Sequence, residues 1–235
     1  MKMLRCTAGA VMLAAMSGCA GLDTAGSGPP ADSPVFRVGD RWIYHAIDGF
    51  RAPLTWDETH EVVAVAPEAV TIRVTETGPN ARGERSETWA AAGRLAVGPV
   101  FDDETRTFTP PVTIYGFPMA PGQRWNQWVD NVNGATRKPG QINRYVTVDG
   151  WTRVATPAGS YDALKLRVLM RLDDDEFWRS PTECNYVVYY APAVGAMVRA
   201  EKNAQYFEKG DRRDGIGAIQ SQHATLELTS WSRAP

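Results

Sequence analysis

Apolar and polar residues alternate along several short stretches of this chain, and this period of two constrains the fold more than any other feature. Residues 70–75 alternate Val, Ile and Val with Thr, Arg and Thr. Residues 164–172 repeat the pattern over a longer stretch, broken on the polar side by Leu169, and residues 146–149 and 225–229 give shorter examples. Successive side chains of a strand point to opposite faces, so each stretch predicts a strand with one buried face. No apolar stripe at helical spacing extends over about twelve residues.

Turn signals separate these stretches. Short strands joined by tight turns, each with one apolar face, indicate antiparallel pairing. We therefore predict an all-β, mainly antiparallel fold, with a single curved sheet that forms a half-barrel or a barrel of roughly 10–12 strands. The turn signals are Asp48-Gly49, Gly78-Pro79-Asn80, Asn133-Gly134, Pro139-Gly140, Asp149-Gly150, Pro157-Ala158-Gly159 and Asp214-Gly215.

A weak internal similarity also runs through the chain. Residues 38–42, Val-Gly-Asp-Arg-Trp, are similar to residues 121–125, Pro-Gly-Gln-Arg-Trp, and each copy precedes an alternating strand by about twenty residues. Two related β-meanders would explain the similarity. A recurrent way of starting a strand, with Gly in the turn and Trp over the edge of the core, would explain it equally well.

The first nineteen residues have the layout of a secretory signal. Lys2 and Arg5 precede an uncharged stretch, residues 8–16, and Ser17-Gly18 lead into Cys19. The apolar stretch is far shorter than the roughly 20 residues that cross a bilayer as a helix. Small residues directly before a cysteine resemble the bacterial lipobox, with Met16 in place of the usual Leu. The resemblance implies that residues 1–18 are a lipoprotein signal peptide and that Cys19 carries the lipid. Ordinary cleavage that leaves Cys19 as a thiol is the alternative.

The residues after Cys19 predict a tether. Residues 19–34 are rich in Gly, Pro and Ser and cannot bury a core, so we expect a lipid-anchored flexible spacer there and a single β-rich domain over residues 35–235. No Asp follows the anchor, and Ala20 favours the outer membrane under the enteric sorting rule. The expected location is the bacterial cell envelope, on the outer membrane facing the periplasm.

Charge and cysteine content limit the partners. Removal of Lys2 and Arg5 from 25 basic residues leaves 23 against 27 acidic residues, with no basic stripe interleaved with aromatics. We therefore expect no nucleic acid partner. The expected partners are the membrane, through the lipid at Cys19, and an unknown envelope protein or apolar small molecule. Cys184 is the remaining cysteine of the mature chain and is expected to be buried and inert.

Three motifs resemble a family of uncharacterised β-rich bacterial envelope lipoproteins. Residues 39–44 match the opening G-x-x-W-x-Y, residues 157–163 match P-A-G-[TS]-[FY]-x-A, and residues 190–195 match Y-A-P-x-V-G. The resemblance implies a fold and brings no activity with it. The chemistry of these motifs is that of turns, because Pro fixes φ and Gly accepts conformations closed to other residues. The expected structural turn residues are Pro157, Ala158, Gly159, Pro192 and Gly195.

Catalytic and metal-binding patterns are missing. His45, His60 and His223 show no zinc spacing and are expected to face solvent from strands. The acidic runs 102–104, 130–134 and 173–176 lack the positions of a calcium loop, so we expect no metal and no cofactor. No Gly-x-Ser-x-Gly elbow or phosphate loop occurs, and we expect no enzyme.

Aromatic residues are the one suggestive feature, with eight tryptophans in the chain. They can seal the core of a sheet or line a ligand site. The weak candidates for ligand binding are Trp125, Trp128, Trp178 and Tyr189. Three functions stay open. The first is a non-catalytic binding or interaction module, the second a carrier of lipid or another apolar ligand in a β-sheet cavity, and the third an envelope hydrolase that pairs Cys184 with His223 or His60.

Overall fold

The structure, a computed structural model, describes residues 26–49, 52–100, 104–210 and 217–235. The predicted signal peptide and the predicted lipidation site Cys19 lie outside the described residues, as do Asp102, Asp103 and Asp214. No helix in the described part of the chain is long and apolar enough to cross a membrane.

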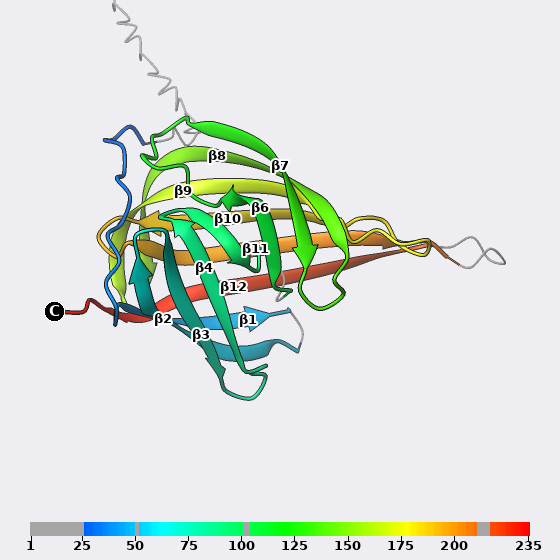
Figure 1. Ribbon diagram of the computed structural model, residues 1–235, viewed down its shortest axis with the longest axis horizontal. Coiled ribbons are helices and arrows are strands. Elements are labelled where there is room, and N and C mark those ends of the chain that lie inside the picture. The colour runs from blue at the N-terminus through cyan, green and yellow to red at the C-terminus, as the bar shows by residue number, and fades with distance from the viewer. Residues whose placement is uncertain (1–25, 50–51, 101–103, 211–216) are drawn as a thin grey trace, which may run out of the picture.

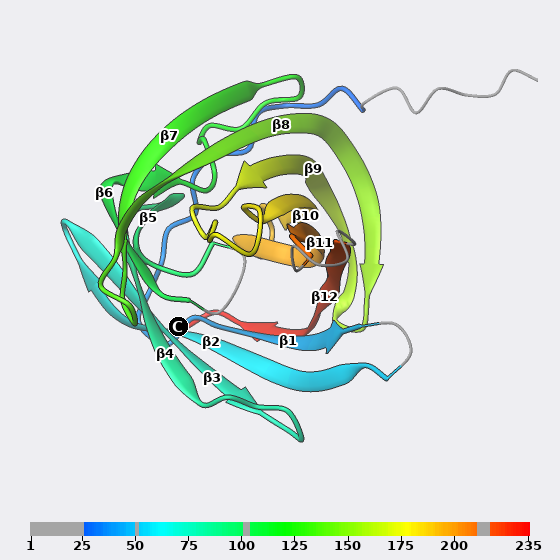
Figure 2. The same cartoon turned by 90° about the vertical axis from the view of Figure 1, so that its right-hand side faces the viewer.

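The described residues form twelve antiparallel strands in one closed barrel (Figure 1). Each strand pairs with its neighbours in sequence, and β1 pairs with β12 to close the sheet, as Figure 2 shows. The all-β antiparallel prediction is confirmed, and of the two predicted forms the structure has the closed one. The strands are β1 (Arg41–Asp48), β2 (Leu54–Ala66), β3 (Ala69–Thr77), β4 (Glu84–Ala91), β5 (Arg94–Gly98), β6 (Arg106–Thr113), β7 (Arg124–Asn133), β8 (Pro139–Thr156), β9 (Gly159–Arg171), β10 (Glu183–Ala191), β11 (Ala196–Glu208) and β12 (Ala218–Ser232).

The alternating residues of β8 and β9 form the best-packed wall of the barrel. Val146, Val148, Leu164, Leu166 and Val168 all point inward and are fully buried. Burial of each such side chain contributes roughly 1.5–3 kcal/mol before the entropy of ordering is counted. The polar residues between them face outward, as the period of two predicts.

The two predicted turn motifs lie at hairpins. Pro157 and Ala158 connect β8 to β9, where Gly159 has φ +134° and the Tyr161 hydroxyl donates a hydrogen bond to the Ala158 carbonyl at 2.8 Å. Gly195, with φ +73°, precedes β11, and its N–H donates to the Ala191 carbonyl at 2.9 Å. A positive φ at both glycines explains why these turns need glycine.

Residues 26–37 form a strap along one end of the barrel, the blue segment of Figure 1. Ala31 is buried and exchanges two backbone hydrogen bonds with Met119, and the Trp151 indole donates to the Pro29 carbonyl at 3.0 Å. The expectation of a flexible spacer up to residue 34 is therefore wrong for residues 26–34. Composition alone missed this packing because the strap is held mainly through its backbone, and the carbonyls of Gly26 and Pro29 accept hydrogen bonds as those of any other residue do.

The internal similarity has a structural counterpart at the starts of β1 and β7. Gly39 and Gly122 have φ +94° and +82°, and their N–H groups donate to the carbonyls of Val62 in β2 and Val148 in β8, both at 2.8 Å. The amides of Val62 and Val148 donate back to the residue after each glycine, both at 2.9 Å. The same turn thus starts the first and the seventh strand.

The register after these turns is equivalent as well. A bulge follows Val62 in the pairing of β2 with β3, and a bulge follows Val148 in the pairing of β8 with β9. Four residues before each bulge, on the inward face, stand Glu58 and Arg144. The barrel therefore consists of two six-stranded halves, β1–β6 and β7–β12, in which Glu58 and Arg144 occupy equivalent positions.

The same registers match β4 with β10. Val74 of β3 pairs with Arg85 of β4, and Val168 of β9 pairs with Tyr186 of β10. In each half, the residue at the bulge pairs with a residue of the next strand. Val74 and Val168 each lie two positions after that paired residue. Arg85 and Tyr186 are therefore equivalent, although their chemistry differs.

Candidate functional site

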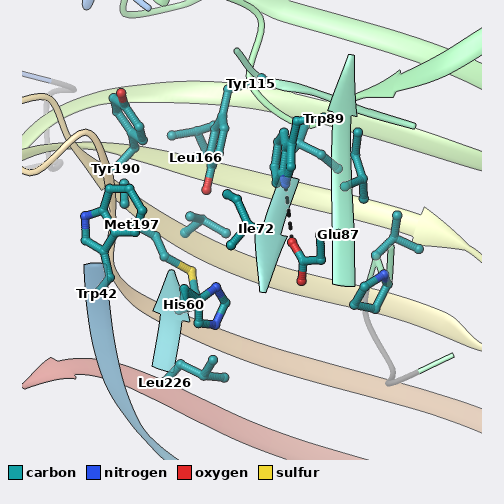
Figure 3. A pocket seen from close by; sticks show the side chains of 18 of the residues that line it. Trp42, His60, Ile72, Glu87, Trp89, Tyr115, Leu166, Tyr190, Met197 and Leu226 are labelled. Atoms are coloured by element: carbon teal, nitrogen blue, oxygen red, sulfur yellow. Dashed lines mark hydrogen bonds between the residues drawn. The ribbon is translucent and has the colours of Figure 1, made fainter. Parts of the chain in front are cut away.

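The barrel encloses a cavity of about 190 Å³ near the strap. Figure 3 shows side chains from both halves around it. Strands β1–β5 and β8–β12, the strap and the segment after β6 all contribute. The lining residues used below are Trp42, Tyr44, Glu58, His60, Ile72, Arg85, Glu87, Trp89, Tyr115, Phe117, Arg144, Leu166, Tyr186, Tyr190, Met197, Ala200 and Lys202.

Aromatic rings form one side of the cavity. The ring of Tyr115 lies 5.1 Å from Tyr190, 5.9 Å from Phe117 and 6.5 Å from Trp89, and it is stacked parallel to Trp89. These separations fall in the range of favourable aromatic pairs. The cluster presents flat apolar surface to the cavity.

The Tyr115 hydroxyl points into the cavity (Figure 3) and makes no hydrogen bond with the residues that the structure describes. Burial, together with Tyr190, raises the pKa of Tyr115 above its ordinary value, while the charge of Arg144 acts in the opposite direction. The hydroxyl is therefore a neutral group that can donate a hydrogen bond to a ligand.

The opposite side of the interior is ionic. The Arg85 guanidinium contacts Glu58 at 3.0 Å, Glu76 at 3.1 Å and Glu87 at 3.4 Å. Burial alone would lower the pKa of Arg85, but the surrounding carboxylates raise it. One cation thus holds three carboxylates from β2, β3 and β4 together inside the barrel, and Arg82 also contacts Glu76 at 3.3 Å.

Glu58 is the most constrained of these carboxylates. It accepts hydrogen bonds from the Trp56 indole at 3.0 Å and from Arg85, and it pairs with Nε2 of His60 at 2.9 Å. Burial would raise the pKa of Glu58, but His60 and Arg85 together hold it well below its ordinary value. The carboxylate is fixed in its ionised form and orients the imidazole, whose ring lies 5.0 Å from that of Tyr44.

Arg144 is the exception among the interior charges. It is 1 % exposed, and its guanidinium donates to the Thr113 carbonyl at 2.8 Å, the Tyr186 hydroxyl at 3.4 Å and the Ile114 carbonyl at 3.5 Å. Within the described parts of the chain, no carboxylate lies within 4.0 Å of it. Neutral oxygens are the partners that the structure shows for this buried cation.

The four aromatic candidates from the sequence do not line this cavity. Trp128 is 63 % exposed, Trp178 is 41 % exposed near the tip of the β9–β10 connection, and Tyr189 lies on the outward face of β10. Trp125 packs against the core and donates to the Thr113 carbonyl at 3.3 Å. The structure brings Trp42 and Trp89 to the cavity instead.

The histidines have different environments. His45 pairs with Asp57 on the outer surface, and His223 is hydrogen-bonded to Asn203 at 2.7 Å. The expectation of a solvent-facing histidine is wrong for His60, which lines the cavity. Polar residues stand on both faces of this part of β2, so alternation does not show which face points inward.

Cys184 is buried and forms no disulfide among the described residues. Cys184 of β10 pairs with Ala204 of β11, which in turn pairs with Gln222 of β12. His223 of β12 belongs to the next row of paired residues across the sheet, together with Asn203. Adjacent rows of a sheet point to opposite faces, so the Cys184 thiol and the His223 imidazole extend from opposite faces of the sheet. His60 lies on β2, on another part of the wall. The pairing of β10, β11 and β12 therefore does not bring the Cys184 thiol and the His223 imidazole to one face.

In the acidic run 173–176, Asp174 binds neighbouring groups of the chain. Asp174 accepts hydrogen bonds from the Thr182 amide at 2.7 Å and from Arg179 at 2.8 Å. In the part of the chain that the structure describes, no group of three or more His, Cys, Asp or Glu residues is arranged to hold a metal ion.

The fold and the cavity together define a closed twelve-stranded barrel with a partly ionic interior. No protein-family model matches the chain, and no curated protein matches it. Two crystal structures are similar over most of their length. One is a protein of Parabacteroides distasonis provisionally described as a lipoprotein, with 12 % identity, a TM-score of 0.49, and coverage of 86 % of this chain and 98 % of that one.

The second is a protein of Bacteroides fragilis, provisionally described as exported and as having a YmcC-like fold. It has 14 % identity and a TM-score of 0.49, and the similarity covers 87 % of this chain and 100 % of that one.

Proposed function

We propose that this chain is a membrane-anchored periplasmic lipoprotein that binds a small, largely apolar molecule inside its barrel without chemically altering it. The observation that carries the proposal is the cavity of about 190 Å³ with an aromatic wall. Of the functions that the sequence leaves open, this is the second, a carrier of an apolar ligand in a β-sheet cavity.

The cavity volume limits the size of the ligand. An apolar protein cavity of about 150 Å³ binds benzene, whereas drug-sized ligands occupy roughly 300–1,000 Å³. A compound with a single ring, or the end of a larger molecule, therefore fits the barrel better than a whole acyl chain. This favours a small apolar ligand over a lipid as the cargo.

The lipobox resemblance supports the location. Cys19 with its preceding Ser17-Gly18 supports a lipid anchor, and Ala20 supports the outer membrane. Separation of inner and outer membranes on a density gradient, followed by detection of the protein, tests this part of the proposal. Recovery in the inner membrane would overturn the outer-membrane assignment.

The binding function is tested by native mass spectrometry of the full chain purified from membranes, followed by solvent extraction. We expect a small apolar compound at one equivalent per chain. The matched variant is Ala200→Phe, which adds a phenyl group at a buried lining position of β11. This variant should stay folded and lose the compound.

Ala155→Phe is the control, because it adds the same atoms on the exposed outer face of β8. It should keep the compound. A wild-type protein that carries nothing and binds no small aromatic compound would contradict the proposal.

Protein–protein interaction is a second candidate, and one surface favours it. Phe177, Trp178, Phe207 and Ile219 are exposed at the end where β9–β12 protrude in Figure 1. Phe207 and Ile219 are cross-strand partners, and the Lys209 amide donates to the Trp178 carbonyl at 2.8 Å, so the four lie close together. A photo-crosslinking amino acid at position 177 in intact cells would capture an envelope partner, and Leu54, exposed on β2, is the control position.

A further inference from the structure

We infer that the ligand of the cavity is an organic anion, an apolar ring that bears a carboxylate, and that Arg144 binds its charge. The inference rests on the proposed function and narrows the ligand class. It starts from Arg144, a fully buried cation for which the described residues supply no carboxylate partner.

Burial makes the solitary charge of Arg144 unusual. Charged side chains are almost never fully buried unless they are paired, because an unpaired ion in a medium of low polarity is destabilising. Arg144 is 1 % exposed and has carbonyl and hydroxyl oxygens as its described partners. Because arginine stays protonated, it cannot relieve this cost by losing its proton. An anion that enters the cavity would supply the missing charge.

In the other half of the barrel, the charged residue at the equivalent position has a partner of opposite charge. At the position equivalent to Arg144 stands Glu58, and its partner is Arg85, at 3.0 Å. In the second half the residue equivalent to Arg85 is Tyr186, which is neutral and lies 3.4 Å from Nε of Arg144. The ion pair of one half is thus replaced by a cation beside a phenol in the other.

The surroundings of Arg144 suit a carboxylate. A guanidinium has five N–H donors in a planar fork that matches the two oxygens of a carboxylate, and Arg144 makes three hydrogen bonds, two of them 3.4 Å or longer. The Tyr115 hydroxyl faces the same cavity and can donate as well.

The carboxylates that line the cavity are already bound. Glu58 and Glu87 both contact Arg85, so the described lining residues leave Arg144 without a carboxylate partner. The rings of Tyr115, Phe117, Tyr190 and Trp89 supply the surface for the apolar part of the ligand.

The test compares three probes that share one ring: benzoate, benzyl alcohol and benzylamine. Each is titrated into the full chain by isothermal calorimetry at about pH 7, where carboxylates are ionised. We expect benzoate to bind about tenfold to 100-fold more tightly than benzyl alcohol, since the difference is one charge-assisted contact, and benzylamine to bind most weakly.

Arg144→Met removes the charge and keeps the length of the side chain, so benzoate should lose its advantage while benzyl alcohol binds as before. Arg144→Lys should restore part of the preference. Arg153→Met is the control on the same strand, because Arg153 faces outward and pairs with Asp162, and it should change nothing. Thermal unfolding checks that each variant is folded.

The outcomes separate the two proposals. If benzyl alcohol binds as tightly as benzoate, or if Arg144→Met keeps the preference for benzoate, the anion inference is overturned and the binding function stands. If none of the three probes binds, both are overturned.

Discussion

The two halves of the barrel share a backbone plan and differ in what they place inside it. In β1–β6 the interior carries Glu58, Glu76 and Glu87, which share Arg85 through contacts of 3.0–3.4 Å, and Arg82 and His60 add contacts to Glu76 and Glu58. In β7–β12 the buried residues are mainly aliphatic and aromatic, and Arg144 is buried among them without a carboxylate partner in the described parts of the chain. Strand register is therefore conserved between the halves, while the interior chemistry is free to diverge.

The aliphatic residues act as the scaffold of the barrel, and the interior charges form the site. The aliphatic wall supplies burial energy and needs no partner, whereas each interior charge needs one. The first half provides partners for its charges, whereas the described residues supply no carboxylate to Arg144 in the second half. Four changes test this contrast, from the largest expected effect to the smallest.

Arg85→Met should have the largest effect. The change leaves three carboxylates together in the barrel without their shared cation, and loss of one partner from a buried ionic group destabilises a protein by about 3–5 kcal/mol. Urea unfolding measures the change. Arg73→Met is the control, because Arg73 pairs with Glu61 outside the barrel and is 42 % exposed, so it should lose about 1 kcal/mol or less. Equal losses for the two variants would show that the interior cluster is not a coupled unit.

Leu166→Ala should destabilise the aliphatic wall by about 2–5 kcal/mol, since it removes buried carbons and enlarges a cavity. Ile72 of β3 is the equivalent residue in the first half, of the same size, and it is 7 % exposed. Ile72→Ala should lose less because Ile72 is less completely buried than Leu166, which is 1 % exposed. If chemical denaturation gives equal losses, the two walls are packed alike.

Glu58→Gln should reduce the acid sensitivity of the protein. The pKa of Glu58 lies below its ordinary value of 4.5, so folding favours the ionised form. Its contribution is present above the ordinary pKa and is lost as pH falls, on the order of 2 kcal/mol between about pH 5 and pH 2. The variant should be less stable at neutral pH and lose less on acidification. A wild-type slope in the variant, measured by unfolding at several pH values, would contradict this role.

Arg144→Met should change the stability of the ligand-free protein least, by about 1 kcal/mol or less in either direction. The lost hydrogen bonds to Thr113 and Ile114 oppose the gain from removal of a buried charge without a carboxylate partner. Thermal unfolding after removal of bound ligand measures it. A loss as large as that of Arg85→Met would mean that the chain itself supplies the counter-charge.

Much of the fold could be predicted from alternation, and the reason is visible in the second half. Residues 146–148 and 164–172 alternate between an apolar interior and a polar exterior, which is the pattern that period-two reasoning detects. Closure of the sheet could not be predicted, because it depends on the pairing of β1 with β12 across nearly the whole chain.

A β-sheet cavity was among the expectations, but the residues that line it could not be predicted from alternation. On β4 the inward residues are Arg85, Glu87 and Trp89. Arg85 and Glu87 are charged, as residues on a solvent-exposed face usually are. Glu58 and His60 on β2 present the same difficulty. A pattern of polar residues on both faces of a strand, next to strands with clear alternation, is the signal that points to an interior site.

The strap sets how far the barrel can stand from a membrane. With the lipid on Cys19, as proposed, and the chain already fixed at Gly26 by its backbone bridge to Trp151, seven peptide steps separate the anchor from the barrel wall. Fully extended, they reach about 25 Å. The flexible tether is therefore shorter than the composition of residues 19–34 suggests. It attaches to the barrel at the side of β8 and keeps the barrel from moving freely through the periplasm.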